Sequence, residues 1–308
     1  MKKTLFIITL MLLYNIGLTA AQAAPLKVVA SFTIVGDLAK QVGGDDVEVK
    51  TLVGADSDAH VFQPTPNDAK ALKEADVIII NGLGFEGWIN RLIESSGTKA
   101  AVIVASKGIE KTLKLEEEDK QAGHKHNHHH HSVNDPHAWQ NLQNGRQYVK
   151  NITAGLIAAD AENAADYTKR AAALDSELAA LDAWTKAQIE TVPAEKRSVI
   201  TTHEAFGYFA DAYKVTFLAP TGLNTEDEPS AKELKALVKQ IKSGKTRALF
   251  IENMSNANVI KQLATESGAV VGAKLYADAL SAENGAAPTY QAMFRYNVAA
   301  LVDGMKQN

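Results

Sequence analysis

Three histidines of this chain lie outside a histidine-rich segment and are candidates for metal chemistry: His60, His137 and His203. His60 follows a strand that is expected to end near Val53, and His203 directly follows the expected strand 198–202. Ligands of α/β proteins bind outside the carboxyl ends of the strands, where the connecting loops converge. Two of the three imidazoles therefore lie where a site is predicted, and a shared metal ion is one interpretation of them.

A fourth candidate ligand is a carboxylate. Asp278 lies in the loop after the expected strand 270–275, and His137 is expected to open a helix. Three neutral imidazoles and one carboxylate complete a four-coordinate shell for zinc. Successive candidates lie about 70 residues apart and form no compact motif. The residues alone therefore leave a structural role open for each of them, such as a buried histidine or a helix-capping aspartate.

The histidine-rich segment covers residues 116–132 and reads EEEDKQAGHKHNHHHHS. Its six histidines are His124, His126, His128, His129, His130 and His131. Ala122 is its only apolar residue, so a disordered loop is predicted. Two roles stay open for it. It is either a solvated linker or a weak, exchangeable zinc-collecting segment. In the second case it loses zinc as its imidazoles become protonated at about pH 6.5.

The elements that must position these side chains form two similar sets. From Leu26 onward, short β-branched runs alternate with longer helical patterns, which is typical of right-handed βαβ units with a mainly parallel sheet. The first set has strands at 27–31, 47–53, 77–81 and 101–105 and helices at 34–42, 67–74 and 85–95. The second set has strands at 198–202, 215–219, 248–252 and 270–275 and helices at 205–213, 230–242, 257–268 and 289–306.

A long helix is predicted between the two sets. Residues 160–190 contain no glycine or proline and are rich in good helix formers. An apolar stripe at helical spacing indicates packing: Leu174, Leu178, Leu181, Trp184 and Ile189. The predicted fold class is α/β, with two lobes that are each a mainly parallel sheet flanked by helices and are joined by this helix. The expected boundaries are an N-terminal lobe at 24–159, the linking helix at 160–190 and a C-terminal lobe at 191–308.

The first 23 residues have the features of a secretory signal peptide. Lys2 and Lys3 precede an apolar run at 5–13, and a small-x-small pattern ends at Ala23. The run is too short for a membrane span, which needs about 20 apolar residues. We expect cleavage after Ala23 and release of a soluble protein into a bacterial periplasm.

Composition narrows the function further. The chain has 308 residues and a formal net charge of -4, without the basic excess that phosphate neutralisation requires, so nucleic acid is not an expected partner. It has no cysteine, which excludes disulfides, thiolate metal sites and a cysteine-linked lipid anchor. Any metal site must use histidine, carboxylate or carbonyl ligands, and we expect a monomer without a membrane anchor.

Four segments resemble the metal-specific solute-binding proteins of bacterial ABC importers, which have the TroA-like fold, and in particular their zinc-specific, ZnuA-like branch. These segments are 58–64 (DAHVFQP), 134–139 (NDPHAW), 202–209 (THEAFGYF) and 278–281 (DALS). The resemblance extends over essentially the whole chain after the signal peptide. It implies a Zn²⁺ cargo and delivery to a membrane permease that is powered by a cytoplasmic ATPase.

The resemblance also implies which residues bind the metal at the interlobe cleft. His60 and His137 would come from the first lobe, and His203 and Asp278 from the second. Manganese-type relatives place a glutamate at the position of His203, whereas three imidazoles favour zinc. The fourth ligand stays open between Asp278, the adjacent Glu204 and water.

Two functions of other classes are alternatives to this one. A zinc hydrolase needs an open coordination position for water, but the chain has no HExxH motif and no evident general base. A periplasmic zinc chaperone or an adhesin-type relative is the other alternative, although adhesion lacks the expected surface anchor. We therefore expect a binding protein rather than an enzyme, and a periplasmic zinc chaperone that loads it is a further candidate partner.

Overall fold

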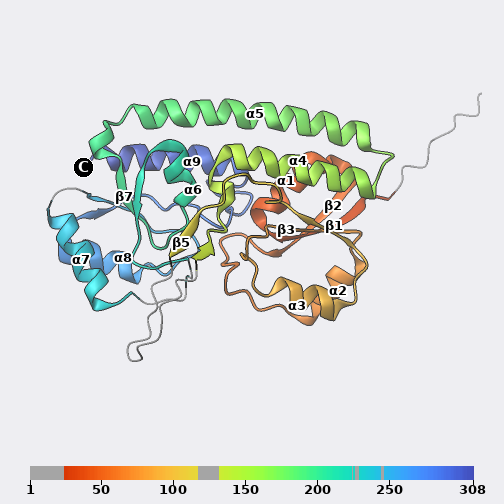
Figure 1. Cartoon of the computed structure of the whole chain (residues 1–308), viewed down its shortest axis with the longest axis horizontal. Helices are drawn as coiled ribbons and strands as arrows, with labels where there is room; N and C mark the ends of the chain where they lie inside the picture. The colour runs from red at the N-terminus through yellow and green to blue at the C-terminus, as the bar shows by residue number, and fades with distance from the viewer. Residues whose placement is uncertain (1–23, 117–131, 224, 226–228, 244–245) are drawn as a thin grey trace, which may run out of the picture.

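The computed structural model describes residues 24–116, 132–223, 225, 229–243 and 246–308. The predicted signal peptide lies outside these residues. Figure 1 shows two sheet-containing lobes side by side, with the long helix α5 running across both, which confirms the predicted fold class. Within the described residues, no helix is both long enough and apolar enough to cross a membrane.

The first lobe is built on a parallel four-stranded sheet with the order β2-β1-β3-β4. Its strands are β1 (Leu26–Phe32), β2 (Val47–Val53), β3 (Val77–Ile80) and β4 (Ala101–Val104), and its helices include α1 (Thr33–Gly43), α2 (Pro66–Glu74) and α3 (Ile89–Ser96). Helices lie on both faces of this sheet (Figure 1). All four residues of β3 are consequently buried.

The second lobe repeats this plan with the strand order β10-β9-β7-β8. Its strands are β7 (Ser198–Ile200), β8 (Thr216–Leu218), β9 (Ala248–Leu249) and β10 (Val270–Val271), and its helices are α6 (Gly207–Tyr213), α7 (Ala231–Lys242), α8 (Asn258–Ser267) and α9 (Tyr290–Met305).

The strands β9 and β10 are shorter than the sequence predicts. Val271 pairs with Leu249, and pairing resumes only at an isolated bridge between Leu275 and Glu252. Between these two pairs, the chain that continues β10 therefore has one more residue than the chain that continues β9. The extra residue interrupts the hydrogen-bond ladder as a bulge does.

Two long helices follow the first sheet, α4 (Leu142–Ala159) and α5 (Ala164–Glu190). The sequence predicts a helix that opens at His137 but gives it no end, and α5 begins at Ala164 rather than at residue 160. Asp160 makes a turn between the two helices, because its Oδ2 accepts hydrogen bonds from Asn163 Nδ2 at 2.8 Å and from the Tyr167 hydroxyl at 2.6 Å.

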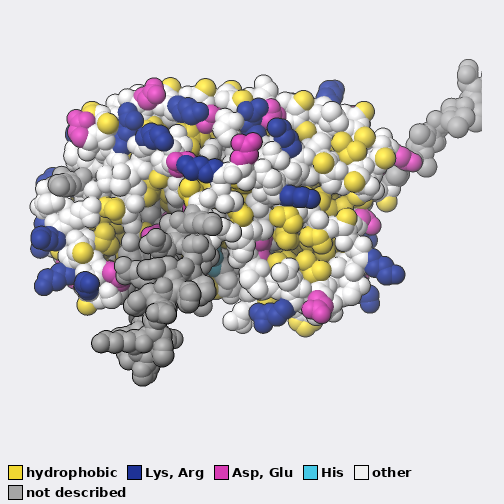
Figure 2. Space-filling model, viewed as in Figure 1, with side chains coloured by type: hydrophobic (Ala, Val, Ile, Leu, Met, Phe, Trp, Pro, Cys, Tyr) yellow, Lys and Arg dark blue, Asp and Glu magenta, His cyan; other side chains and the backbone are white. Residues whose placement is uncertain are grey.

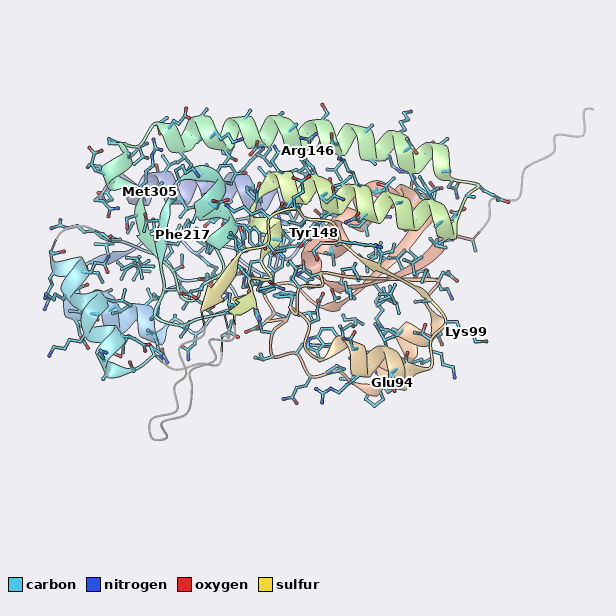
Figure 3. The ribbon with its side chains drawn as sticks, viewed as in Figure 1. Glu94, Lys99, Arg146, Tyr148, Phe217 and Met305 are labelled. Atoms are coloured by element: carbon cyan, nitrogen blue, oxygen red, sulfur yellow. The ribbon has the colours of Figure 1, made fainter. Side chains whose placement is uncertain are left out.

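Helix α5 connects the lobes by packing along both of them. It contacts α1 and α4 of the first lobe and α6 and α9 of the second. Four residues of the predicted stripe are buried and Trp184 is partly buried. The side chain of Arg146 on α4 reaches Asp175 on α5 through two hydrogen bonds of 2.7 and 2.8 Å, whereas the hydroxyl of Tyr148 on the same helix donates to Asn81 Oδ1, directly after β3 (both residues are labelled in Figure 3).

The prediction of a disordered loop over 116–132 is wrong at both ends. Glu116 ends β5 (Lys114–Glu116), and Ser132 begins β6 (Ser132–Asn134), and the two strands form an antiparallel pair. Backbone hydrogen bonding extends beyond the strands, since the N–H of Asp135 donates to Leu113 O at 2.9 Å. The six clustered histidines lie between the strands, outside the described residues.

The two lobes share one continuous apolar core beside the site. It includes Phe32 and Trp139 of the first lobe and Tyr290 and Phe294 of the second. The hydroxyl of Tyr290 donates to Trp139 O, and the indole N–H of Trp139 donates to Ala277 O at 2.9 Å. The lobes are thus joined by direct packing as well as by α5.

Candidate metal centre

The three histidines and the aspartate meet where the lobes join, and their ligand atoms all lie within 4.8 Å of one another. Asp278 Oδ2 lies 3.3 Å from His60 Nε2 and 3.1 Å from His203 Nε2, and Asp278 Oδ1 lies 3.6 Å from His137 Nε2. The Nε2 atoms of His60 and His137 are 3.2 Å apart. The structure brings together all four residues that the sequence analysis selected, two from each lobe.

His60 is positioned by a turn in the loop between β2 and α2. Its backbone N–H donates to Asp58 Oδ1 at 2.8 Å, and the preceding carbonyl of Ala59 accepts the indole N–H of Trp88 at 2.8 Å. Its ring stands edge-on to Phe85, with centroids 4.7 Å apart. Its side chain has an exposed fraction of 11% and is the most exposed of the four in the cluster.

His137 is fully buried and is held from behind by a carboxylate. Asp135 Oδ1 accepts both the backbone N–H of His137 at 2.9 Å and its ring Nδ1–H at 2.8 Å. Asn81 Nδ2 donates to the Pro136 carbonyl at 2.9 Å and fixes the turn to the end of β3. The expected helix start is one 3-10 turn, Ala138–Gln140, before α4.

His203 is also buried and is supported in the same way by Glu252, three residues after the end of the neighbouring strand β9. Its Nδ1 contacts Glu252 Oε2. The other oxygen, Glu252 Oε1, accepts the backbone N–H of Thr202 at 2.8 Å and that of His203 at 3.2 Å. Both buried imidazoles therefore direct Nε2 toward Asp278.

The loop that carries Asp278 is held to the first lobe on both sides of the aspartate. On one side of it, Ala277 O accepts the indole N–H of Trp139 and the side-chain amide of Gln140 from the first lobe. On the other side, the N–H of Leu280 donates to Thr33 Oγ1 at 2.8 Å. The carboxylate of Asp278 is fully buried.

The charges of the cluster perturb one another strongly. Burial lowers the pKa of His137, but Asp278 and Asp135 outweigh it and raise this pKa to about 9. Burial likewise lowers the pKa of His203, yet Glu252 and Asp278 hold it well above its ordinary value. Burial raises the pKa of Asp278, whereas the two imidazoles hold it well below its usual range. These opposite pKa shifts favour protonated His137 and His203 beside an ionised Asp278 when no metal is bound.

Several atoms of the cluster lack a hydrogen-bond partner although they are buried. They are both carboxylate oxygens of Asp278 and Nε2 of His203. Leaving a buried polar atom unpaired costs about 1–3 kcal/mol. A divalent cation among these atoms would remove that cost, and a set of three nitrogens and one carboxylate is complete for a four-coordinate ion. The donor set therefore fits a metal.

Glu204 does not join the cluster. Its side chain is exposed, and its backbone N–H donates to Gly222 O at 3.2 Å. Among the described residues, Asp278 is the only carboxylate in the cluster that could hold a metal ion. Figure 2 shows that histidine surface reaches the exterior at the junction of the lobes.

Comparison with known sequences places the whole chain in one family. Residues 28–304 match the sequence model of ZnuA, described as the periplasmic component A of the zinc-uptake complex. The chain belongs to the ZnuA family. FimA of Streptococcus parasanguinis, a metal ABC transporter substrate-binding lipoprotein, is 31% identical over 94% of this chain and 93% of its own. PsaA of Streptococcus pneumoniae, a manganese ABC transporter substrate-binding lipoprotein, is 30% identical over 100% of both chains.

Solved structures support the same assignment. The periplasmic zinc-binding protein TroA of Treponema pallidum has a TM-score of 0.82 at 27% identity, covering 91% of this chain and 99% of its own. The Mn-bound periplasmic metal-binding protein of Candidatus Liberibacter asiaticus has a TM-score of 0.77 at 30% identity, with the same coverage. This ZnuA-family chain is a metal-binding component of an uptake system rather than an enzyme.

Sequence reasoning missed the two carboxylates that hold the imidazoles. Asp135 could have been found, because the spacing Asp-x-His occurs at both 58–60 and 135–137. In each case the aspartate accepts the backbone N–H of the histidine. Glu252 gave no comparable signal, since it lies 49 residues from His203 in the chain.

Proposed function

We propose that this ZnuA-family chain binds one Zn²⁺ ion through His60, His137, His203 and Asp278 and delivers it to an ABC-type permease. The observation that carries the proposal is the buried cluster of three imidazoles and one carboxylate at the junction of the lobes. Asp278 Oδ2 and His203 Nε2 have no hydrogen-bond partner and lie 3.1 Å apart. Such atoms are stable together only with protons or a cation between them.

Manganese is the competing cargo, since PsaA is named for manganese. The donor set favours zinc, because manganese prefers oxygen-rich shells and lies lowest in the Irving–Williams order. Three of the four donors here are nitrogen atoms. We therefore propose zinc as the physiological cargo.

Delivery requires partners and a compartment. We propose a periplasmic monomer, released by cleavage after Ala23, whose partners are a permease and its cytoplasmic ATPase. A periplasmic chaperone that loads the cluster is a further proposed partner. We also propose that the histidines of the segment between β5 and β6 collect zinc weakly, because six imidazoles lie within residues 124–131.

Metal analysis tests the cargo. The mature protein, purified without chelator, should contain one equivalent of zinc, and a chelator competition should give a much higher affinity for zinc than for manganese. A matched variant that lacks 120–131 removes the clustered histidines, so that only the interlobe site is counted. A deletion variant that binds manganese as tightly as zinc would contradict the proposed selectivity.

Transport is tested separately in the host. Deletion of the gene should lower cellular zinc when external zinc is scarce, and the wild-type gene should restore it. The His203→Ala variant should not restore zinc although it is exported and folded. Full restoration by this variant would show that delivery does not use the cluster.

A further inference from the structure

Two buried carboxylates contact the imidazoles of His137 and His203 from behind, but they use their oxygens differently. Asp135 serves its histidine through one oxygen, Oδ1, which accepts both the backbone N–H and the ring Nδ1–H of His137. Glu252 uses both of its oxygens: Oε1 accepts backbone N–H groups, and Oε2 contacts the ring Nδ1 of His203. This difference has a chemical consequence.

We propose that Glu252 is a positioning residue that selects the metal-binding tautomer of His203, and that it can do so only as a carboxylate. The inference deepens the proposed function, because it assumes that Nε2 of His203 binds the cargo. A neutral imidazole carries one N–H. When Nδ1 donates that hydrogen to Glu252, Nε2 presents its lone pair to the cluster, 3.1 Å from Asp278 Oδ2.

The neighbours of Glu252 fix which hydrogen bonds each of its two oxygens accepts. Its Oε1 faces the backbone N–H groups of Thr202 and His203 at 2.8 and 3.2 Å, and these groups can only donate. Its Oε2 faces the ring and the Ser255 hydroxyl, which is 3.3 Å away and can donate or accept. Both Glu252 and His203 are buried, so water does not replace either contact.

The amide in Glu252→Gln would reverse the tautomer. Its single oxygen must face the two backbone N–H groups, because they cannot accept a hydrogen bond. Its NH₂ group then faces Nδ1 of His203 and donates to it, and the Ser255 hydroxyl can turn to accept. Nδ1 becomes the acceptor, so the ring hydrogen moves to Nε2 and occupies the position of the metal.

Asp135→Asn is the matched control. Its amide oxygen can take the place of Oδ1 and keep both hydrogen bonds to His137. The other position, Oδ2, has no hydrogen-bond partner in the structure. The two variants each remove one carboxylate charge behind one imidazole, and they differ in whether the amide is compatible with an Nδ1–H tautomer.

Zinc affinity of the two variants tests the proposal. Chelator competition at pH 7.5 should show a loss of about 10–100-fold for Glu252→Gln, the range typical of such supporting residues, and a loss several times smaller for Asp135→Asn. Urea unfolding of both metal-free variants checks that they are folded. Equal losses in two folded variants would overturn the proposal, because they would show that charge alone matters.

A second measurement does not depend on the variants. In the zinc-loaded wild type with ¹⁵N-labelled histidine, NMR should show a hydrogen on Nδ1 of His203 and the metal on Nε2. Metal on Nδ1 would overturn the inference even if Glu252→Gln fails to fold. If the wild type binds no zinc, the proposed function fails instead, and the tautomer of His203 is then read in metal-free protein at alkaline pH.

Discussion

Asp37 should make the stability of the chain depend on pH through the junction of the lobes. It lies on α1 of the first lobe, and its Oδ2 accepts the N–H of Tyr290 at the start of α9 at 2.8 Å. The same oxygen accepts from Gln41 Nε2 at 2.7 Å. Burial raises the pKa of Asp37 from 3.8 to about 6, although these two hydrogen bonds lower it.

The size of the contribution of Asp37 to the free energy of unfolding follows from this pKa shift. A raised pKa means that the folded chain binds the proton more tightly than the unfolded chain does. The resulting stabilisation is complete below pH 3.8 and is lost as the pH rises through about 6. A shift of this size corresponds to about 3 kcal/mol, and we expect about 2 kcal/mol because the side chain keeps some contact with solvent.

The variant Asp37→Asn isolates this contribution. Its amide oxygen can accept both hydrogen bonds but does not ionise. The free energy of unfolding of the variant minus that of the wild type should therefore increase by about 2 kcal/mol between pH 3.5 and pH 7. Urea unfolding of the metal-free proteins at several pH values measures it.

The control for that experiment is Asp303→Asn, whose side chain is 82% exposed and which should show no comparable trend. If the difference between Asp37→Asn and the wild type stayed constant within about 0.5 kcal/mol over this pH range, the reasoning from burial would be refuted.

Four further predictions concern the site. Alanine in place of any one of the three histidines should reduce zinc affinity by more than about 100-fold, and Asp278→Ala should cost less if water replaces the carboxylate; titration against a chelator ranks them, and negligible losses throughout would reject the site. Deletion of 120–131 should leave the zinc affinity of the tight site nearly unchanged and abolish additional weak zinc equivalents, as calorimetry would show; retention of the weak equivalents would show that the segment does not bind them. Zinc affinity should fall as the pH decreases from 8 to 6, because the pKa of His137 is about 9 without metal and zinc must displace that proton; calorimetry in buffers of different ionisation enthalpy should detect proton release, and its absence would contradict the assigned charges. Trp139→Phe removes the hydrogen bond to Ala277 and should cost about 1 kcal/mol of stability while accelerating zinc release in stopped-flow experiments; unchanged release would show that this bond does not hold the Asp278 loop.

The two carboxylates behind the imidazoles give the cluster a fixed geometry before any ion arrives. His137 and His203 are buried and held at Nδ1, whereas His60 keeps an exposed fraction of 11%. The loop of Asp278 is tied to Trp139 and Thr33 of the other lobe. Three of the four proposed ligands are thus preorganised, which reduces the ordering cost of binding.

The local sequence determined the elements and the candidate ligands. Hydrophobic patterning and β-branched runs are properties of neighbouring residues, so they predicted the two α/β lobes, the helix that ends at Glu190 and the strands that precede His60 and His203. The rule that loops converge at the carboxyl ends of parallel strands was enough to select Asp278. The structure places all four selected residues together, and their binding of zinc stays a proposal.

Tertiary structure alone decided the features that depend on contacts between distant residues. The bulge that shortens β10 and the hairpin at Glu116 and Ser132 arise from strand register, which no local pattern encodes. The pairing of Glu252 with His203 joins residues 49 positions apart, because the order of strands in the sheet makes them neighbours. Burial and unsatisfied charge, which make the cluster suited to a cation, exist only once both lobes have packed together.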